Sequence, residues 1–384
     1  MSLTIQNNIA AMNAHRQLQI SDAGLSKSLE RLSSGFRINR AADDAAGLSI
    51  SMQMNADIAS YKMASRNAAE ATSLLQVAEG ATDQISNMLT RLKELATQAS
   101  SANASGNLDK INAEGNQLID EINRIAKVTE YSGTKLLDGS FGVTVSSATG
   151  GMTAGNGYGG ASGLQSGVTY TVATTANAGG GFDITASATI GGVAVTQTLT
   201  GVTAPSSGTE KVNFDALGLT LTLNSGLTTD GDSMDGTIVA STATASNFQI
   251  GAQNTSNNRI GILLGNVVAS NTDGTGLSAG LNLAKDQLLT AANAQNFLDS
   301  VDSAISTLAG RRGDIGAAQN RLGYATANLS TTIENVQSAE STIRDTDMAS
   351  EMTTFTKNQI LLQAGTAMLA QANMAPQTLL SLFK

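Results

Sequence analysis

Residues 71–99 read ATSLLQVAEGATDQISNMLTRLKELATQA, and this stretch decides the fold of the chain. Steps of three or four residues trace a series through it that meets no polar side chain. The members of the series are Ala71, Leu74, Ala78, Ala81, Ile85, Met88, Leu92, Leu95 and Ala99. Because an α-helix turns once every 3.6 residues, these side chains share one face, as in the seam of a coiled coil. We therefore predict one long helix here.

Two further stretches carry the same period. After the Ser-, Asn- and Gly-rich turn of residues 100–107, the apolar series resumes over 108–125 and predicts a second helix that folds back on the first. In the C-terminal third, seven aliphatic residues are spaced seven apart: Val301, Leu308, Ile315, Leu322, Leu329, Val336 and Ile343. The neighbouring series is mixed, which indicates a helix packed within a bundle. Four glycines weaken this helix by up to about 1 kcal/mol each: Gly310, Gly313, Gly316 and Gly323.

Between residues 141 and 250 the sequence changes to a period of two, with β-branched runs separated by Gly, Ser, Asn and Asp. This pattern predicts strands, and the best candidates are residues 167–173, 182–186, 193–199, 211–223 and 237–240. Few of their side chains are large, so we expect a small core; the composition also fits partial disorder. The run Gly155–Gly160 has the spacing of a phosphate-binding loop, but no convincing strand and helix flank it. We interpret it as a flexible turn.

Both ends of the chain read as amphipathic helices without an obvious partner inside one molecule. The apolar residues expected at an assembly interface are Ile5, Ile9, Met12, Leu18, Leu25, Leu29 and Leu32 near the N-terminus, and Met352, Phe355, Ile360, Leu361, Met368, Leu369, Leu380 and Leu382 near the C-terminus. Three kinds of partner fit these faces: the opposite end of the same chain, another subunit, or a carrier protein.

Charge and composition exclude several classes of function. The net charge of −9 argues against a general nucleic-acid-binding surface, which would be basic. The chain has no Cys and one His, His15, so it cannot supply disulfides, a multi-His metal site or a convincing His-dependent triad. We therefore expect no enzyme, cofactor or metal. No stretch reads as a cleaved signal peptide or a membrane span, which leaves the cytosol or an export route without a cleaved signal.

Paired carboxylates occur at Asp43–Asp44 and at Asp345 with Asp347. Such pairs can carry out acid–base chemistry or bind a cation. We interpret them instead as charges at helix N-termini that pair with Arg37 or Arg344.

Four blocks near the two ends of the chain resemble bacterial flagellin, in order and in position. The N-terminal part contains RLSSGFRIN at residues 31–39 and DDAAGL at 43–48, where the family shows RLSSGxRIN and DDAAG. The C-terminal part contains IRDTDMA at 343–349 and QAGTAMLAQAN at 363–373. The middle of the chain carries no resemblance of this kind.

The periodicity predicts a mainly α chain with a central β-rich insert. The resemblance adds that long antiparallel helices from both termini form a coiled coil and that the β domain projects outward. The expected segments are an N-terminal coiled-coil core segment at 1–45, a helical hairpin at 46–140, a β-rich outer domain at 141–250, a long-helix segment packing on the hairpin at 251–343, and a C-terminal core segment at 344–384.

The resemblance also implies a function. It implies a secreted subunit that polymerises with copies of itself into the helical filament of the bacterial flagellum. Its further implied partners are an export chaperone, the type III flagellar export apparatus, and hook-associated and cap proteins, with no nucleic acid and no membrane insertion. The alternative is a hook–filament junction protein, which is similar at its termini.

Flagellins also resemble one another at a stretch that is read by Toll-like receptor 5, close to QRxRELAxQ. Here residues 90–98 read TRLKELATQ, in which Arg91, Glu94 and Leu95 match. Glu114 on the returning helix fits a further contact position. The resemblance therefore implies recognition through these four residues, although Leu95 also belongs to the apolar seam and is a candidate for packing.

Overall fold

The chain forms two compact units, which are described separately: residues 1–63 with 328–384, and residues 64–327. In the computed structural model the described residues are 8–101, 103, 106–177, 181–190, 192–227, 234–269 and 280–382, with the backbone alone described over 375–382. The division between the units falls within two continuous helices. The units meet at residues 63/64 and 327/328, whereas the sequence analysis placed segment boundaries after residues 45 and 343.

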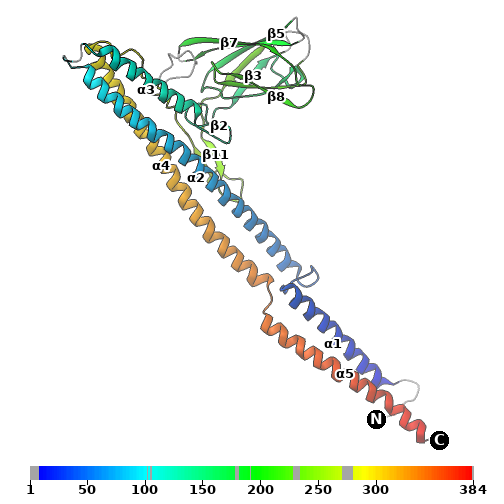
Figure 1. Ribbon diagram of the computed structural model, residues 1–384. Helices are drawn as coiled ribbons and strands as arrows, with labels where there is room; N and C mark the ends of the chain where they lie inside the picture. The colour runs from blue at the N-terminus through cyan, green and yellow to red at the C-terminus, as the bar shows by residue number, and fades with distance from the viewer. Residues whose placement is uncertain are drawn as a thin grey trace. The chain divides into compact units, whose positions relative to one another are not determined.

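Long helices form both ends of the described chain. They are α1 Ile9–Ser34, α2 Ala45–Ala99, α3 Leu108–Val128, α4 Ala291–Arg344 and α5 Met348–Leu382 (Figure 1). At a rise of 1.5 Å per residue, α2 and α4 each extend for about 80 Å. The strands and short 3-10 helices are β1 Glu130–Tyr131, β2 Thr134–Lys135, β3 Val145–Gly150, η2 Ala154–Asn156, β4 Tyr158–Ser162, β5 Thr169–Ala176, β6 Phe182–Ile190, β7 Val193–Val202, β8 Thr209–Phe214, β9 Leu219–Asn224, β10 Gly236–Ala240, β11 Ser246–Gln249, η3 Ser256–Asn258 and β12 Arg259–Ile262.

Within unit 64–327, α2 runs antiparallel to α4. Side-chain contacts fix this direction, because Glu79 bonds to Gln319, Asp83 pairs with Arg312, and Lys93 pairs with Asp302. The predicted seam of α2 lies in the core, and Leu75, Leu89 and Ala96 are buried beside it. This second buried row arises because α3 also packs on α2 and buries Ile119 and Ile122 in the same cluster.

The C-terminal seven-residue series is buried from Val301 to Leu329, and its last two members are half-buried. Helix α4 begins only at Ala291, so the first part of the 251–343 segment is not helical. Ile260 and Ile262 alternate as buried residues in β12, which pairs with β11. The Thr290 hydroxyl accepts the Asn293 amide and marks the start of the helix.

The central region contains two antiparallel sheets that contribute to one apolar core. The strand orders are β3-β10-β5-β6-β7 and β4-β9-β8. The core is larger than the sequence predicts, because Tyr170, Phe182 and Phe214 fill it. Residues 211–223 form parts of β8 and β9 rather than one strand. Gly155–Gly160 is more regular than the turn that the sequence predicts: it contains the last two residues of η2 and the start of β4, which pairs with β9.

Within unit 1–63 with 328–384, the connection after α1 meets the break between α4 and α5. Helix α1 ends at Ser34, and Gly35 adopts φ 75°, a left-handed conformation that suits glycine. Phe36 and Asp345 then form an antiparallel β-bridge. The Arg37 amide donates to the Arg344 carbonyl at 2.7 Å, and the Arg344 guanidinium lies 4.1 Å from the centre of the Phe36 ring. The two interruptions are thus joined to each other.

Candidate assembly interface and receptor surface

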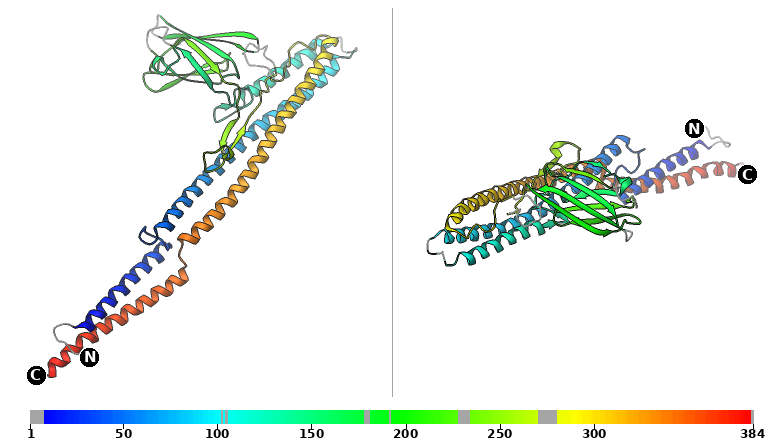
Figure 2. Two further views of the ribbon diagram at one scale, coloured as in Figure 1. Left: turned by 180° about the vertical axis from the view of Figure 1, so that it is seen from behind. Right: turned by 90° about the horizontal axis from the view of Figure 1, so that it is seen from above.

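Helices α1 and α5 lie side by side and antiparallel (Figures 1 and 2). At one end, Asn8 Nδ2 donates to the Ala372 carbonyl at 2.8 Å. At the other end, Arg31 Nη1 lies 3.4 Å from Glu351 Oε2. The N-terminal and C-terminal helices of one chain therefore pack against each other.

The contact between α1 and α5 follows heptad positions on both helices. The residues at these positions all have reduced exposure: Ala11, Ala14, Leu18, Ser21, Leu25, Ser28 and Leu32 on α1, and Glu351, Phe355, Asn358, Leu362, Gly365, Leu369 and Ala372 on α5. Many of these side chains are small or polar. A Cβ added at Gly365 would lie 3.0 Å from Leu18 Cδ1, so the helices approach closely there. The seam between α1 and α5 therefore combines Leu and Phe side chains with small and polar ones.

The large apolar side chains of both helices mostly lie outside this seam. Those with 41% to 67% of their surface exposed are Ile9, Met12, Ile20, Leu29, Met348, Met352, Ile360, Leu361, Met368 and Met374. Single exposed apolar residues are ordinary on a protein surface, but a set of this size on two paired helices indicates an interaction site. We call this set, whose members are distributed over several sides of α1 and α5, the outward apolar face.

The predicted interface residues divide between the two surfaces. Leu18, Leu25, Leu32, Phe355 and Leu369 lie in the seam between α1 and α5. Ile9, Met12, Leu29, Met352, Ile360, Leu361 and Met368 belong to the outward apolar face. Ile5 and the side chains of Leu380 and Leu382 lie outside the described residues. The sequence reasoning missed Ile20, Met348 and Met374, although their size and helical placement were a usable signal.

The paired carboxylates have structural roles. Asp44 Oδ1 accepts the Gly47 amide at the start of α2, and Asp347 Oδ1 accepts the Ala349 amide at the start of α5. Asp345 accepts the Ser341 hydroxyl. Asp43 pairs with Lys27 at 2.8 Å and not with Arg37 as expected.

Arg37 and Arg344 also differ from the expectation. Arg37 donates to the Ile343 carbonyl, and Arg344 lies 3.9 Å from Glu340. Neither arginine pairs with the carboxylates that the sequence suggested. Both lie next to the β-bridge between Phe36 and Asp345 and contact residues of the neighbouring end of α4 instead.

The predicted receptor residues gather on α2 and α3, with one exception. Arg91 Nη1 lies 2.8 Å from Glu94 Oε2, and Arg91 Nη2 lies 2.8 Å from Glu114 Oε1. All three side chains are about half exposed, and the Glu94 and Glu114 carboxylates raise the pKa of the Arg91 guanidinium. Leu95 is only 1% exposed and packs in the core, so it is not available for direct contact.

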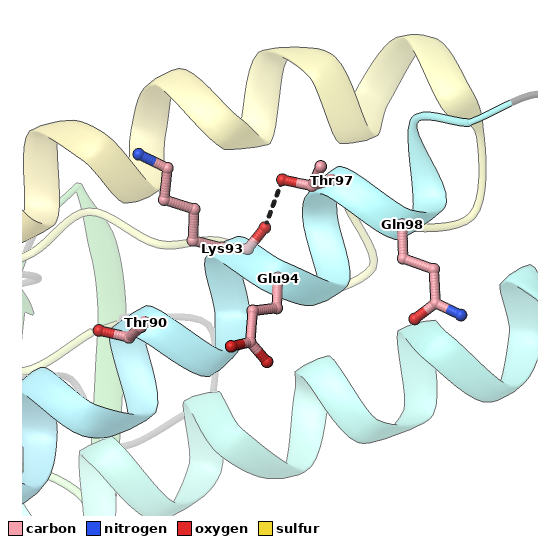
Figure 3. Close-up of a pocket in the computed structure, with 5 residues that line it drawn as sticks. All are labelled: Thr90, Lys93, Glu94, Thr97 and Gln98. Carbon is pink, nitrogen blue, oxygen red and sulfur yellow. Dashed lines mark hydrogen bonds between the residues drawn. The ribbon is translucent and has the colours of Figure 1, made fainter.

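A shallow groove of about 460 Å³ lies beside this cluster and is lined by Thr90, Lys93, Glu94, Thr97 and Gln98. In Figure 3, Glu94 and Gln98 extend toward one neighbouring helix, whereas Lys93 extends toward the other. The Thr97 hydroxyl donates to the Lys93 carbonyl at 2.8 Å and is thereby turned along its own helix. The groove is shallow and open, which suits contact with another protein better than the enclosed site that a small ligand requires.

Comparison with known proteins decides the family. Residues 5–142 match the bacterial flagellin N-terminal helical region, and residues 298–383 match the bacterial flagellin C-terminal helical region. The chain belongs to the bacterial flagellin family. Polar flagellin C of Vibrio parahaemolyticus is 35% identical over 100% of both chains. A flagellin of Clostridium tyrobutyricum is 37% identical over 98% of this chain and 100% of its own length.

Solved structures give weaker similarity to this flagellin. A Bacillus cereus flagellin is 20% identical with a TM-score of 0.32, covering 69% of this chain and 88% of its own. Flagellar hook-associated protein-3 of Legionella pneumophila is 14% identical with a TM-score of 0.35, covering 75% of this chain and 97% of its own. At these scores neither similarity supports an argument about function.

This flagellin is a structural subunit of the flagellar filament and not an enzyme. Its full-length similarity to flagellins favours that role over a hook–filament junction protein. His15 is exposed on α1, and the described residues contain no group of three or more His, Cys, Asp or Glu that is arranged to hold a metal. Over the same residues, no helix has the length and apolar character that crossing a membrane requires.

Proposed function

We propose that this flagellin polymerises through the outward apolar face of α1 and α5. The observation that carries the proposal is the separation of side chains on these helices. Leu and Phe side chains share the seam inside the chain with small and polar residues, whereas large apolar residues such as Ile9, Ile360 and Met368 remain exposed. Burial of such side chains contributes about 1.5–3 kcal/mol each. Contact with further copies of the chain is the arrangement that buries them in a homopolymer.

The polar residues in the seam between α1 and α5 also support this proposal. Ser21 and Ser28 are buried at heptad positions where a coiled coil that is stable alone would carry Leu or Ile. Glu351 is buried beside Arg31, and such a pair contributes little net stability because both ions lose water. We infer that α1 and α5 are stabilised mainly by assembly, which shifts the folding equilibrium through mass action.

The outward apolar face also suggests partners other than further copies of the chain. We propose that an export chaperone covers α5 before assembly, and that the chain leaves the cell through the type III flagellar export apparatus. In the finished extracellular filament, hook-associated and cap proteins would meet the same terminal helices at the filament ends, and the central β-rich region would face solvent. The outward apolar face supports the chaperone in particular, because an exposed face of this size promotes aggregation while the subunit is free.

Truncation tests the assembly proposal. Removal of about twenty residues from either end deletes part of the outward apolar face and shortens the seam. Seeded growth should then give no filaments by electron microscopy, whereas circular dichroism should show that unit 64–327 remains folded. Normal filaments from either truncated chain would refute the proposal. The full-length chain provides the control, and short stubs or rings from it would indicate a junction protein instead.

We also propose that Toll-like receptor 5 recognises the exposed cluster of Arg91, Glu94 and Glu114. The half-exposed arginine between two carboxylates supports this, because such groups form specific hydrogen bonds at a protein interface. An Arg91→Ala variant should activate the receptor less than the native chain in a reporter-cell assay. Arg124→Ala is a matched control, because Arg124 is an exposed arginine of α3 that pairs with Glu121. Equal activation by native chain and Arg91→Ala would remove this surface as the receptor site.

A further inference from the structure

The methionines of the chain are distributed unevenly between its two units. Of the 12 methionines, those with 48% to 67% of their surface exposed are Met12, Met52, Met63, Met348, Met352, Met368 and Met374. All of these belong to unit 1–63 with 328–384. In unit 64–327, Met88 is half-buried, Met152 is 4% exposed and Met234 is fully buried. Exposed thioethers therefore collect in the unit that carries the outward apolar face.

We propose that the free subunit is a target for peroxide-class oxidants at these methionines, and that methionine sulfoxide on α1 and α5 prevents its polymerisation. This inference rests on the proposed assembly through the outward apolar face. The residues that carry the effect are Met12 on α1 and Met348, Met352, Met368 and Met374 on α5, since they lie on that face.

The chemistry is a two-electron oxygen transfer. The thioether sulfur attacks one peroxide oxygen, the O–O bond breaks, and an S=O bond forms. The sulfur is oxidised and hydrogen peroxide is reduced to water, so no further reactant is required. The chain contains no Cys and no Trp, and no thiol of its own competes for the oxidant. Access to the sulfur then decides which methionines react.

Sulfoxide formation opposes assembly because it replaces an apolar thioether with a strong hydrogen-bond acceptor. In water this acceptor is solvated, but at a buried contact between subunits it would lose its water without gaining a designed partner. Each methionine of the outward apolar face carries this penalty into the interface, and it also loses part of its apolar contact. The same burial protects these residues once the filament has formed.

Oxidation before and after assembly tests both halves of the proposal. Free subunits and preformed filaments are treated with equal hydrogen peroxide, and peptide mass spectrometry measures sulfoxide at each methionine. Met152 and Met234 are internal references, because their burial does not depend on assembly. We expect oxidation of Met12, Met352 and Met368 in free subunits and little in filaments. Equal oxidation of these residues in both samples would overturn the inference that assembly covers them.

Polymerisation is measured on the same oxidised subunits by seeded sedimentation. We expect the critical concentration to rise about tenfold or more, because loss of one buried apolar contact already approaches that factor. Methionine sulfoxide reductases of both stereospecificities should restore it, which separates sulfoxide from other damage. Normal polymerisation of fully oxidised subunits, or failure of the reductases to restore a lost polymerisation, would overturn the proposal.

Leucine variants provide the matched control. Met12→Leu combined with Leu at positions 348, 352, 368 and 374 keeps an apolar face but removes the sulfur, and its polymerisation should resist peroxide. Met52→Leu with Met63→Leu removes two exposed sulfurs of α2 and should leave the sensitivity unchanged. If the variant with all five leucine substitutions polymerises before peroxide treatment but no longer polymerises after it, the inference is overturned. If it does not polymerise untreated, reductase rescue of the native chain decides. Failure of the untreated native chain to polymerise would instead refute the proposed function.

Discussion

Ile360→Ala separates the stability of the subunit from its assembly. Ile360 lies on the outward apolar face of α5 with 59% of its surface exposed. Full burial of an isoleucine side chain contributes about 1.5–3 kcal/mol, so burial of the exposed part contributes about 1–2 kcal/mol. Alanine removes most of that side chain, and we expect a loss of about 1 kcal/mol per added subunit. This corresponds to an increase of about fivefold in the critical concentration.

Seeded sedimentation at a series of protein concentrations measures this change. The free energy of unfolding of the free subunit, measured by thermal unfolding, should stay within about 0.5 kcal/mol of the native value. Ile122→Ala is the matched control, because Ile122 is fully buried in the core of unit 64–327. It should destabilise the free subunit by about 2–5 kcal/mol. An unchanged critical concentration for Ile360→Ala would refute the reasoning, as would a large loss of subunit stability.

Three further predictions concern the subunit alone. Gly142→Ala should destabilise the subunit by about 1–3 kcal/mol in denaturant unfolding, because φ is 76° and the new Cβ would overlap the Thr244 carbonyl; an unaltered midpoint would contradict this. Gly310→Ala should stabilise α4 by up to about 1 kcal/mol, since no atom lies within 4 Å of the added Cβ, and lower stability would count against it. The Lys27 ammonium and the Arg40 amide lower the pKa of Asp43 to about 2. The ionised Asp43 carboxylate therefore stabilises the folded chain above pH 3.8, and this stabilisation is lost as the pH falls through about 2. Asp43→Asn should therefore be less stable than the native chain at neutral pH, and the difference should disappear as the pH falls below about 2; a pH-independent difference in urea unfolding would refute this.

Helical periodicity predicted most of the long-helix framework because burial repeats with the turn of the helix. Most members of the series through Leu92 and of the series through Leu308 are buried as expected, and the others are half-buried. The pairing of the two terminal helices was predicted from the family resemblance, but apolar periodicity alone left their partner open, because two of the buried positions in the seam are Ser21 and Ser28. A search for apolar side chains passes over such positions, although small polar residues allow close approach of two helices.

The interface set could be predicted as a group but not sorted. The same alternation of exposed and half-buried residues that assigns Leu25 to the seam and Leu29 to the outward apolar face depends on which side α5 occupies. One helix with apolar residues on several sides does not contain that information. Leu95 shows the converse, because a family motif suggested contact where the core of α2 requires burial.

The strand region shows where local pattern was insufficient. Residues 211–223 read as one alternating run, but Leu217 is buried at the turn between β8 and β9, so the alternation continues through a reversal of direction. Gly155–Gly160 contains four glycines and shows no alternation, and the pairing of β4 with β9 gives the part from Tyr158 onward its strand structure. Pairing partners distant in sequence, not local propensity, determine such strands.

The pairing of α1 with α5 also sets the order in which the chain can become structured. Asn8 and Ala372 are in contact although 364 residues separate them. At a synthesis rate of about 5–20 residues per second, α1 leaves the ribosome roughly 20–70 s before its partner. Residues 64–327 contain their own core, and the last of them is made about 45 residues before Ala372, so about 2–9 s remain in which this unit can fold before α1 can meet its partner. Each newly made molecule therefore passes through a period in which its middle is folded while its first helix still waits for its last.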